Sequence, residues 1–403
     1  MGKQHLTILG STGSIGRNTL DVVARFPDRF RVHALAARNN VELLCEQIAA
    51  FQPALAVMYE AQAAQRLRAA LPAKTRTEVL TGMEGLTEAA RCPEVQHVIS
   101  GMVGAVGLLP TYAAIASGKR VSIANKETLV LAGELMVRQA AETGSTLIPM
   151  DSEHNAIFQC LASPPGRELE RIVLTASGGP FRDLPVSQFH GITREQALAH
   201  PNWKMGPKIS IDSATMMNKG LEVIEARWLF GLTPERIEVL VHRQSIVHSM
   251  VEFVDGSVIA QLGLPDMRTP IAYCLSYPSR LPLELPRLNL AEVGRLEFET
   301  VDAEKYPCLA LALHALAVGG GAPAALNGAN EEVVAAYLKD AFHFTEIAVI
   351  LKEAMAQLEI CLAQPQAPSC LRTINTVEDA IAADQWGRNT AHSIIQKRVN
   401  TCC

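Results

Sequence analysis

Two carboxylates separated by one residue follow an apolar segment near the middle of the chain. Residues 146–150 are predicted to form a strand, and Asp151 and Glu153 come directly after it. On an extended segment, residues two apart point to the same side. Burying such a pair is costly unless a cation or protons compensate, and its oxygen atoms suit a hard divalent ion such as Mg²⁺ or Mn²⁺. The pair alone is weak evidence, because a helix-capping cluster is the more frequent explanation, and a metal site needs a third ligand.

A third carboxylate, Glu222, lies on a predicted helix that starts at Asp212 or Ser213. Residues three or four apart share one helix face, so Asn218, Lys219 and Glu222 are expected to point the same way. The lysine, the asparagine and the capping amides near Ser213 suit a phosphate, and Glu222 could complete a metal site of three carboxylates. The alternative is an ion pair between Lys219 and Glu222 on a solvated helix face.

Three glycines spaced by two residues follow the first predicted strand, residues 6–9. Gly10 allows a tight turn, Gly13 lets the backbone approach a pyrophosphate, and Gly16 lets the next helix pack closely on the sheet. The amides of Ser14 and Ile15 would face the anion at the helix N-terminus. The alternative is a glycine-rich turn that binds nothing.

The second predicted strand, residues 31–36, ends without the acidic residue that holds the ribose hydroxyls of NAD. Arg38 and Asn39 follow it instead, and a cation beside an amide suits the extra phosphate of NADP. An arginine in a solvated loop is the alternative for Arg38. Combined with the glycine loop, these residues favour NADP over NAD.

Asn125, Lys126 and Glu127 follow another predicted strand, residues 120–124, at the end where open parallel sheets bind ligands. Lys126 is therefore placed for a substrate, although a lysine after a strand is usually a surface residue. The segment 177–208 combines glycines and prolines with large apolar side chains, which indicates a mobile lid. Trp203 could seal the site, and a core anchor is the alternative role for it.

Composition limits the classes of protein to which this chain can belong. The chain has 403 residues, of which 48% are apolar, enough for two or three domains with real cores. A net charge of -5 provides no basic field for nucleic acid. No apolar run approaches the roughly eighteen residues of a membrane span, and the first strand begins too early for a signal peptide. Nine scattered cysteines without a C-x-x-C pair suit a reducing compartment, so we expect a soluble cytoplasmic protein, with Cys402 and Cys403 in a frayed tail.

Seven segments together resemble the 1-deoxy-D-xylulose 5-phosphate reductoisomerase family over nearly the whole chain. They are residues 10–16, 124–127, 150–154, 177–181, 200–206, 212–222 and 263–270. The resemblance implies that 1-deoxy-D-xylulose 5-phosphate is rearranged and then reduced to 2-C-methyl-D-erythritol 4-phosphate in non-mevalonate isoprenoid biosynthesis. It implies NADPH and a divalent cation as cofactors, Mg²⁺ or Mn²⁺ with Co²⁺ as a further candidate, and a homodimer.

The resemblance also implies the site residues. NADPH contacts are implied at Thr12, Gly13, Ser14, Ile15, Arg38, Asn39, Asn125, Glu127 and Gly206. Metal ligands are implied at Asp151, Glu153 and Glu222. Substrate contacts are implied at Lys126, Ser152, Glu153, Ser177, His200, Ser213, Asn218, Lys219 and Glu222, and catalytic roles at Lys126, Asp151, Glu153, Glu222 and His200. One departure is Ala37, where the family often has glycine, so the loop that binds the adenosine phosphate could differ slightly.

The expected fold is α/β, with a Rossmann-like N-terminal domain, an α+β catalytic domain with a lid loop, and a C-terminal helical bundle. The predicted domains are residues 1–150 for NADPH binding, 151–283 for catalysis and dimerisation with the lid at 177–208, a connecting arm at 284–308, and 309–403 for the helical end. Segments 246–254 and 257–262, joined by Asp255 and Gly256, predict a hairpin whose sheet could pair across the dimer.

Two other functions remain open at this point. Another NADP-dependent reductase, acting on a phosphorylated or semialdehyde substrate, would keep the glycine loop without needing three separated carboxylates. Its activity would survive chelation of metal. A non-enzymatic NADP-sensing protein would keep only the chemistry of the first domain and would not oxidise NADPH with any sugar phosphate.

Overall fold

The computed structural model describes residues 2–161, 168–201, 203 and 205–401. Contacts divide the chain into two compact units. Unit 1 comprises Met1–Thr128, Met136–Asn155 and Asp266–Leu285, and unit 2 comprises Leu129–Leu135, Ala156–Pro265 and Pro286–Cys403. The predicted frayed tail at Cys402 and Cys403 and two residues of the predicted lid, Asn202 and Lys204, lie outside the described residues. The three predicted boundaries between the four segments stay a prediction.

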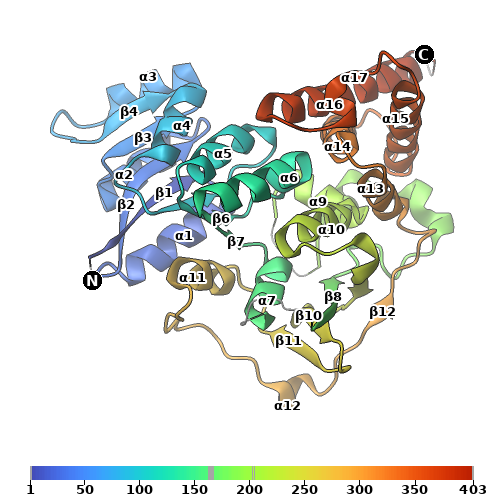
Figure 1. The fold of residues 1–403 in the computed structure, drawn as a ribbon, viewed down its shortest axis with the longest axis horizontal. Helices are drawn as coiled ribbons and strands as arrows, with labels where there is room; N and C mark the ends of the chain where they lie inside the picture. The colour runs from blue at the N-terminus through green and yellow to red at the C-terminus, as the bar shows by residue number, and fades with distance from the viewer. Residues whose placement is uncertain (1, 162–167, 202, 204, 402–403) are drawn as a thin grey trace. The chain divides into compact units, whose positions relative to one another are not determined.

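Unit 1 is built on a seven-stranded sheet with the order β4-β3-β2-β1-β5-β6-β7 (Figure 1). Its strands are β1 (Gln4–Leu9), β2 (Phe30–Ala37), β3 (Leu55–Met58), β4 (Glu78–Thr81), β5 (His97–Ser100), β6 (Arg120–Ile123) and β7 (Thr146–Pro149). Every pairing in it is parallel. The order reverses between β1 and β5, and ligands bind at such a switch point in open α/β sheets. The predicted Rossmann-like fold is confirmed.

Helices connect these strands, as a parallel sheet requires. They are α1 (Ser14–Arg25), α2 (Val41–Phe51), α3 (Ala61–Ala70), α4 (Gly82–Arg91), η1 (Ala105–Gly107), α5 (Leu108–Ala116) and α6 (Lys126–Thr143, bent at Ala132). Two further helices do not connect strands of this sheet: α7 (Ser152–Cys160) follows β7, and α11 (Arg268–Ser276) comes later in the chain. Leu6, Ile8 and Ile99 in the central strands have no exposed surface, because helices cover the sheet. Arg268 of α11 lies 3.5 Å from Asp21 of α1, which ties this late helix to the first one.

Unit 2 contains a mixed five-stranded sheet with the order β11-β10-β8-β9-β12. Its strands are β8 (Leu169–Ala176), β9 (Ile237–Val241), β10 (Val247–Phe253), β11 (Val258–Leu262) and β12 (Glu299–Thr300). β10 and β11 are antiparallel, which confirms the predicted hairpin. Ile172 and Leu174 of β8 pack with Val223 and Val251 in the core of this unit.

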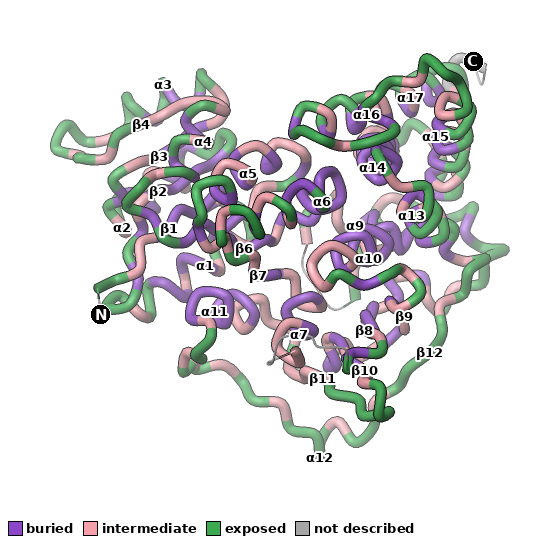
Figure 2. The backbone as a smooth tube through the Cα atoms, in the orientation of Figure 1, coloured by how far each residue is buried: buried purple, intermediate pink, exposed green. Residues whose placement is uncertain are grey.

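Helices make up the rest of unit 2. They are η2 (Val186–Gly191), α8 (Arg194–Leu198), α9 (Pro207–Ala214), α10 (Met217–Phe230), η3 (Pro234–Arg236), α12 (Leu290–Val293), α13 (Pro307–Val318), α14 (Ala322–Tyr337), α15 (Glu346–Leu362), α16 (Ser369–Arg372) and α17 (Val377–Thr401). The predicted helical end is confirmed, with α14 buried at its centre (Figure 2). A Cβ at Gly328 of α14 would lie 1.9 Å from Asp384 O of α17, so glycine permits this close contact. None of the described helices is long and apolar enough to cross a membrane.

The acidic pair does not lie on an extended segment, contrary to the prediction. α7 begins at Ser152, so Glu153 lies in its first turn. Asp151 Oδ1 accepts a hydrogen bond from Ser152 N at 3.0 Å. Carboxylates favour a helix start because the first backbone N–H groups have no partner within the helix. This preference explains why the strand ends and a helix begins at the acidic pair.

The predicted helix around Glu222 is in fact two helices. α9 ends at Ala214 and α10 begins at Met217, with Met216 between them in the left-handed region at φ 61°. Ser213 therefore lies in the last turn of α9 and does not start a helix. Met216 is buried against Tyr306 and Leu309, so tertiary packing holds the break in place.

Candidate functional site

The glycine loop after β1 has the geometry that its spacing predicts. Gly10 has φ +85°, and a Cβ there would lie 2.6 Å from Gly101 O, while a Cβ at Gly16 would lie 2.4 Å from Gly10 O. Gly13 is the N-cap of α1, and among the described residues no side chain caps this helix. Ser14 and Ile15 are the first residues of α1, directly after Thr12 and Gly13 in the loop, so their amides lie at a helix start that can bind an anion.

Arg38 and Asn39 follow β2 and lie at the surface. Arg38 Nε lies 2.9 Å from Glu60 Oε1, and the Asn39 amide nitrogen lies 3.3 Å from each oxygen of the same carboxylate. The Arg38 side chain is 78% exposed, so its guanidinium can reach a ligand. Sequence reasoning missed Glu60, although it follows β3, the strand next to β2, which is a signal that could have found it.

Asn125, Lys126 and Glu127 follow β6 and are buried, at 2%, 8% and 5% exposed. Asn125 caps α6, because its Oδ1 accepts a hydrogen bond from Thr128 N at 2.9 Å. Its Nδ2 donates to Gly104 O at 3.1 Å, which joins this loop to the glycine-rich loop after β5. The burial argues against the alternative of a surface lysine.

Asp151, Ser152 and Glu153 follow β7, the strand next to β6. Lys126 Nζ lies 2.8 Å from Asp151 Oδ2, and Ser152 Oγ donates to Glu153 Oε2 at 2.5 Å. The two carboxylates are half-buried and offer oxygen atoms only, the donor type that Mg²⁺ prefers. The residues present therefore fit a hard divalent cation.

Glu222 lies at the centre of a buried polar group in unit 2. Lys219 Nζ donates to Glu222 Oε2 at 2.5 Å and to Thr175 O at 2.6 Å, and Asn218 Nδ2 donates to Glu222 Oε1 at 2.5 Å. The Lys219 and Glu222 side chains are only 4% and 1% exposed, so the alternative of a solvated ion pair is wrong. A charged pair buried this deeply is costly to stability, which points to a functional role.

Ser177 and His200 meet at the end of β8. Ser177 Oγ lies 3.0 Å from His200 Nε2, and Trp203 N donates to His200 Nδ1 at 2.9 Å. Because Nδ1 accepts from a backbone N–H, Nε2 carries the proton and donates to Ser177. Gly206, the last predicted contact in this segment, is the exposed N-cap of α9.

The predicted phosphate-binding residues of unit 2 gather around the end of β8. Lys219 bonds to the carbonyl of Thr175, and Ser177 is the first residue after the strand. A Cβ at Gly179 would lie 2.7 Å from Ser213 O, which places Ser213 against the same turn. Whether Glu222 joins Asp151 and Glu153 around one cation stays a prediction.

Sequence reasoning also missed the support behind this group. The Asp212 carboxylate is buried, lies 2.8 Å from Lys208 Nζ and accepts a hydrogen bond from Asn330 Nδ2 at 2.8 Å. Asn330 belongs to α14, so the helical end of the chain holds α9 in place. No local pattern around Asn330 carries a signal for this contact.

Known protein families and relatives match this chain along most of its length. Family models match residues 6–133 (1-deoxy-D-xylulose 5-phosphate reductoisomerase), 147–230 (the C-terminal domain of that enzyme) and 262–390 (DXP reductoisomerase C-terminal domain). The 1-deoxy-D-xylulose 5-phosphate reductoisomerase of Nitrosospira multiformis is 52% identical over 394 residues, which cover 96% of this chain and 97% of that protein. The enzyme of the same name from Cupriavidus necator is 53% identical over 391 residues, covering 96% and 97%.

Solved structures of proteins with the same name are also similar to this chain. The 1-deoxy-D-xylulose 5-phosphate reductoisomerase from Zymomonas mobilis in complex with NADPH superposes with a TM-score of 0.89 at 42% identity, over 98% of this chain and 99% of that chain. A DOX-P reductoisomerase in complex with NADPH, fosmidomycin and magnesium superposes with a TM-score of 0.89 at 42% identity, over 98% of both chains.

Proposed function

Since the chain belongs to the 1-deoxy-D-xylulose 5-phosphate reductoisomerase family, we propose that it converts 1-deoxy-D-xylulose 5-phosphate to 2-C-methyl-D-erythritol 4-phosphate with NADPH and a divalent cation. The reaction rearranges the carbon skeleton and then reduces it, and it serves non-mevalonate isoprenoid biosynthesis. The observation that carries this proposal is the match to named relatives along nearly the whole chain, and the matched family models include the glycine loop and both groups of polar residues.

The glycine loop and the residues after β2 are proposed to bind NADPH. The backbone amides of Ser14 and Ile15 would hold the pyrophosphate at the start of α1. Arg38 and Asn39 would bind the 2′-phosphate, which must compete with Glu60 for the guanidinium. Gly206, with Thr12, Gly13, Asn125 and Glu127, completes the proposed set of cofactor contacts.

Asp151, Glu153 and Glu222 are proposed to hold one divalent cation. When bound, the cation supplies Lewis acidity at the ketone oxygen and an adjacent hydroxyl of the substrate. Lys126 would place a second positive charge beside the same oxygens while it orients Asp151. Ser152 would contact the substrate and orient Glu153 through its hydroxyl.

Ser177, Ser213, Asn218 and Lys219 are proposed to bind the substrate phosphate. Their grouping around the end of β8 supports this role, because converging hydroxyl, amide and ammonium donors suit a phosphate. Binding energy from the phosphate, remote from the reacting carbons, would orient the substrate. His200, in the proposed lid, would contact the substrate and exclude water from it.

We further propose a cytoplasmic homodimer. β11 is the outer strand of its sheet and exposes Val258 and Ile259 at 54% and 47%, and an apolar edge strand of this kind can pair with a second copy. The seven cysteines among the described residues are free thiols, which suits a reducing compartment. Ile259→Lys is expected to shift the protein toward monomer in sedimentation, and an unchanged dimer would exclude this edge as the interface.

The decisive assay follows NADPH absorbance with 1-deoxy-D-xylulose 5-phosphate, in the presence of Mg²⁺ or Mn²⁺ and after chelation. We expect oxidation of NADPH only when the substrate and the cation are both present. Activity that survives chelation would favour a metal-independent reductase instead. Failure to oxidise NADPH with any sugar phosphate would favour an NADP-sensing protein.

A further inference from the structure

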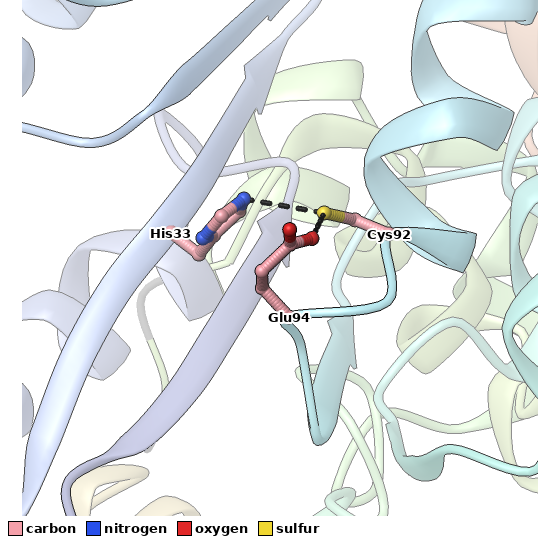
Figure 3. A group of neighbouring side chains, drawn as sticks. All are labelled: His33, Cys92 and Glu94. Carbon is pink, nitrogen blue, oxygen red and sulfur yellow. Dashed lines mark hydrogen bonds between the residues drawn. The ribbon is translucent and has the colours of Figure 1, made fainter.

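A second group of side chains that can bind a metal lies in unit 1. The glycine loop follows the carboxyl end of β1, whereas this group lies toward the opposite end of the strands, before β5 begins. Cys92 follows α4, Glu94 precedes β5, and His33 is the fourth of the eight residues of β2 (Figure 3). Cys92 Sγ lies 3.2 Å from His33 Nε2 and 2.9 Å from Glu94 Oε2. Taking one ligand atom from each side chain, all three atoms lie within 4.8 Å of one another.

The topology of the sheet creates this group. β2 and β5 lie on either side of β1 in the sheet. Because α4 packs on β1 and β3, its last residues lie close to β2, which is between these two strands. His33 and Cys92 are 59 residues apart in the chain. Lys119 Nζ donates to the carbonyls of Cys92 and Val95 at 2.6 Å each, which holds the backbone on both sides of Glu94.

The three side chains form a mixed donor set of thiol, imidazole and carboxylate. Zn²⁺ accepts all three ligand types at tetrahedral sites, whereas Mg²⁺ prefers oxygen ligands alone. Three protein ligands leave one position for water, and the exposed Glu94 leaves an approach from solvent. We propose that His33, Cys92 and Glu94 bind a Zn²⁺-type cation, separately from the hard cation of the reductoisomerase site.

The protonation states of the cluster are compatible with this role. Burial chiefly lowers the pKa of His33, so its imidazole is neutral and can donate a lone pair. Burial, together with the hydrogen bond to Glu94, raises the pKa of the Cys92 thiol. The same hydrogen bond is the main cause that lowers the pKa of Glu94. A cation would take the place of the thiol proton in this contact, so its binding must release that proton.

Other charged and titratable groups face the cluster and tune its affinity. The ring of His5 stacks on His33 at a centroid distance of 6.0 Å. The charges of Arg31 and Lys119 act on His33 as well, and Lys119 favours the thiolate of Cys92. Because both basic residues repel a divalent ion, we expect binding weaker than at a fully enclosed structural zinc site.

Co²⁺ tests the proposal directly, because a cobalt–thiolate bond produces a charge-transfer band that oxygen ligands do not. The holoprotein is titrated with Co²⁺ while excess Mg²⁺ fills the reductoisomerase site. We expect one equivalent to bind with this band in the unmodified protein and in Cys45→Ser, the control thiol on α2. The band should vanish in Cys92→Ser, and Glu94→Gln and His33→Gln should each weaken binding by about tenfold or more.

Zn²⁺ is expected to displace Co²⁺ and to raise the melting temperature of the unmodified protein but not of Cys92→Ser. Turnover with Mg²⁺ and NADPH should be unchanged in Cys92→Ser, because Cys92 lies outside the proposed catalytic and binding residues. A missing band in the unmodified protein, or an undiminished band in Cys92→Ser, would overturn the proposal and leave a hydrogen-bonded cluster only. If Cys92→Ser fails to fold, Glu94→Gln decides in its place, and unchanged cobalt affinity in that variant would count equally against the site.

Discussion

Lys126 Nζ lies 2.8 Å from Asp151 Oδ2, and these residues stand at the starts of α6 and α7, after the neighbouring strands β6 and β7. Their side chains are only 10% and 20% exposed, so water solvates the Asp151 carboxylate only in part. The ammonium of Lys126 compensates the remaining cost of burying this negative charge. Strand adjacency thus brings together a predicted substrate-binding cation and a predicted metal ligand that are distant in the sequence.

Lys126→Gln is expected to lower turnover by about 100-fold or more, because it removes a fixed positive charge beside the oxygens where charge develops. NADPH affinity should change little. Steady-state kinetics and an NADPH titration measure the two effects, with the exposed Lys74→Gln as the control. Near-normal turnover in Lys126→Gln would remove the residue from the chemistry.

Glu222→Gln keeps the shape of the side chain and removes its charge. If Glu222 is a metal ligand, turnover at limiting metal should fall by about 100-fold or more while NADPH affinity is spared. The measurement is kcat against metal concentration, with the exposed Glu235→Gln in the same unit as the matched variant. Unaltered kinetics at limiting metal would contradict the assignment of the third carboxylate.

Arg38→Ala should weaken binding of NADPH by about tenfold and leave NADH nearly unchanged, because a charge-assisted contact with the 2′-phosphate is lost. Glu60→Gln should not weaken NADPH, since its carboxylate competes for Arg38. Fluorescence titrations with both nucleotides measure these affinities. Equal losses for NADPH and NADH in Arg38→Ala would refute the phosphate role.

Gly16→Ala tests the close packing of the glycine loop. The new Cβ would lie 2.4 Å from both Gly10 O and Ser11 Cα, and these backbone atoms cannot move away cheaply. We expect the free energy of unfolding to fall by about 1 to 3 kcal/mol and NADPH affinity to fall with it. Gly191→Ala is the control, because nothing lies within 4 Å of its Cβ. Urea unfolding measures the stability of both variants. Equal stability of Gly16→Ala and Gly191→Ala would contradict the prediction.

His97 predicts an acid sensitivity of the fold. It is fully buried, its Nε2 lies 2.7 Å from Ser122 Oγ, and burial lowers its pKa to about 3. The unfolded chain, with a histidine pKa of about 6.5, binds the extra proton between these values, so stability is lost as pH falls through that window. The slope should reach about 1.4 kcal/mol per pH unit.

Urea unfolding at several pH values from about 7 down to 5 measures this slope. His97→Gln should flatten it, because glutamine carries no titratable group. A slope that survives in His97→Gln would assign the acid sensitivity to other residues.

Short-range spacing was sufficient to predict the residues of the glycine loop and the polar face of α10. Gly10 needs a left-handed φ and Gly16 needs close backbone contact, and both demands select glycine locally. Lys219 and Glu222 meet because the helical period places residues three apart on one face. The Rossmann-like parallel sheet was likewise predicted, whereas its strand order, with the switch point between β1 and β5, comes from the structure.

Tertiary structure alone decided the features that depend on distant contacts. Met216 breaks the helix because packing against Tyr306 and Leu309 holds a conformation that a non-glycine residue avoids by itself. Asn330 reaches Asp212 across 118 residues through the packing of α14 on α9. Local spacing describes the backbone demands and helix faces within one element, whereas partners from different elements depend on strand order and helix packing, which no short segment encodes.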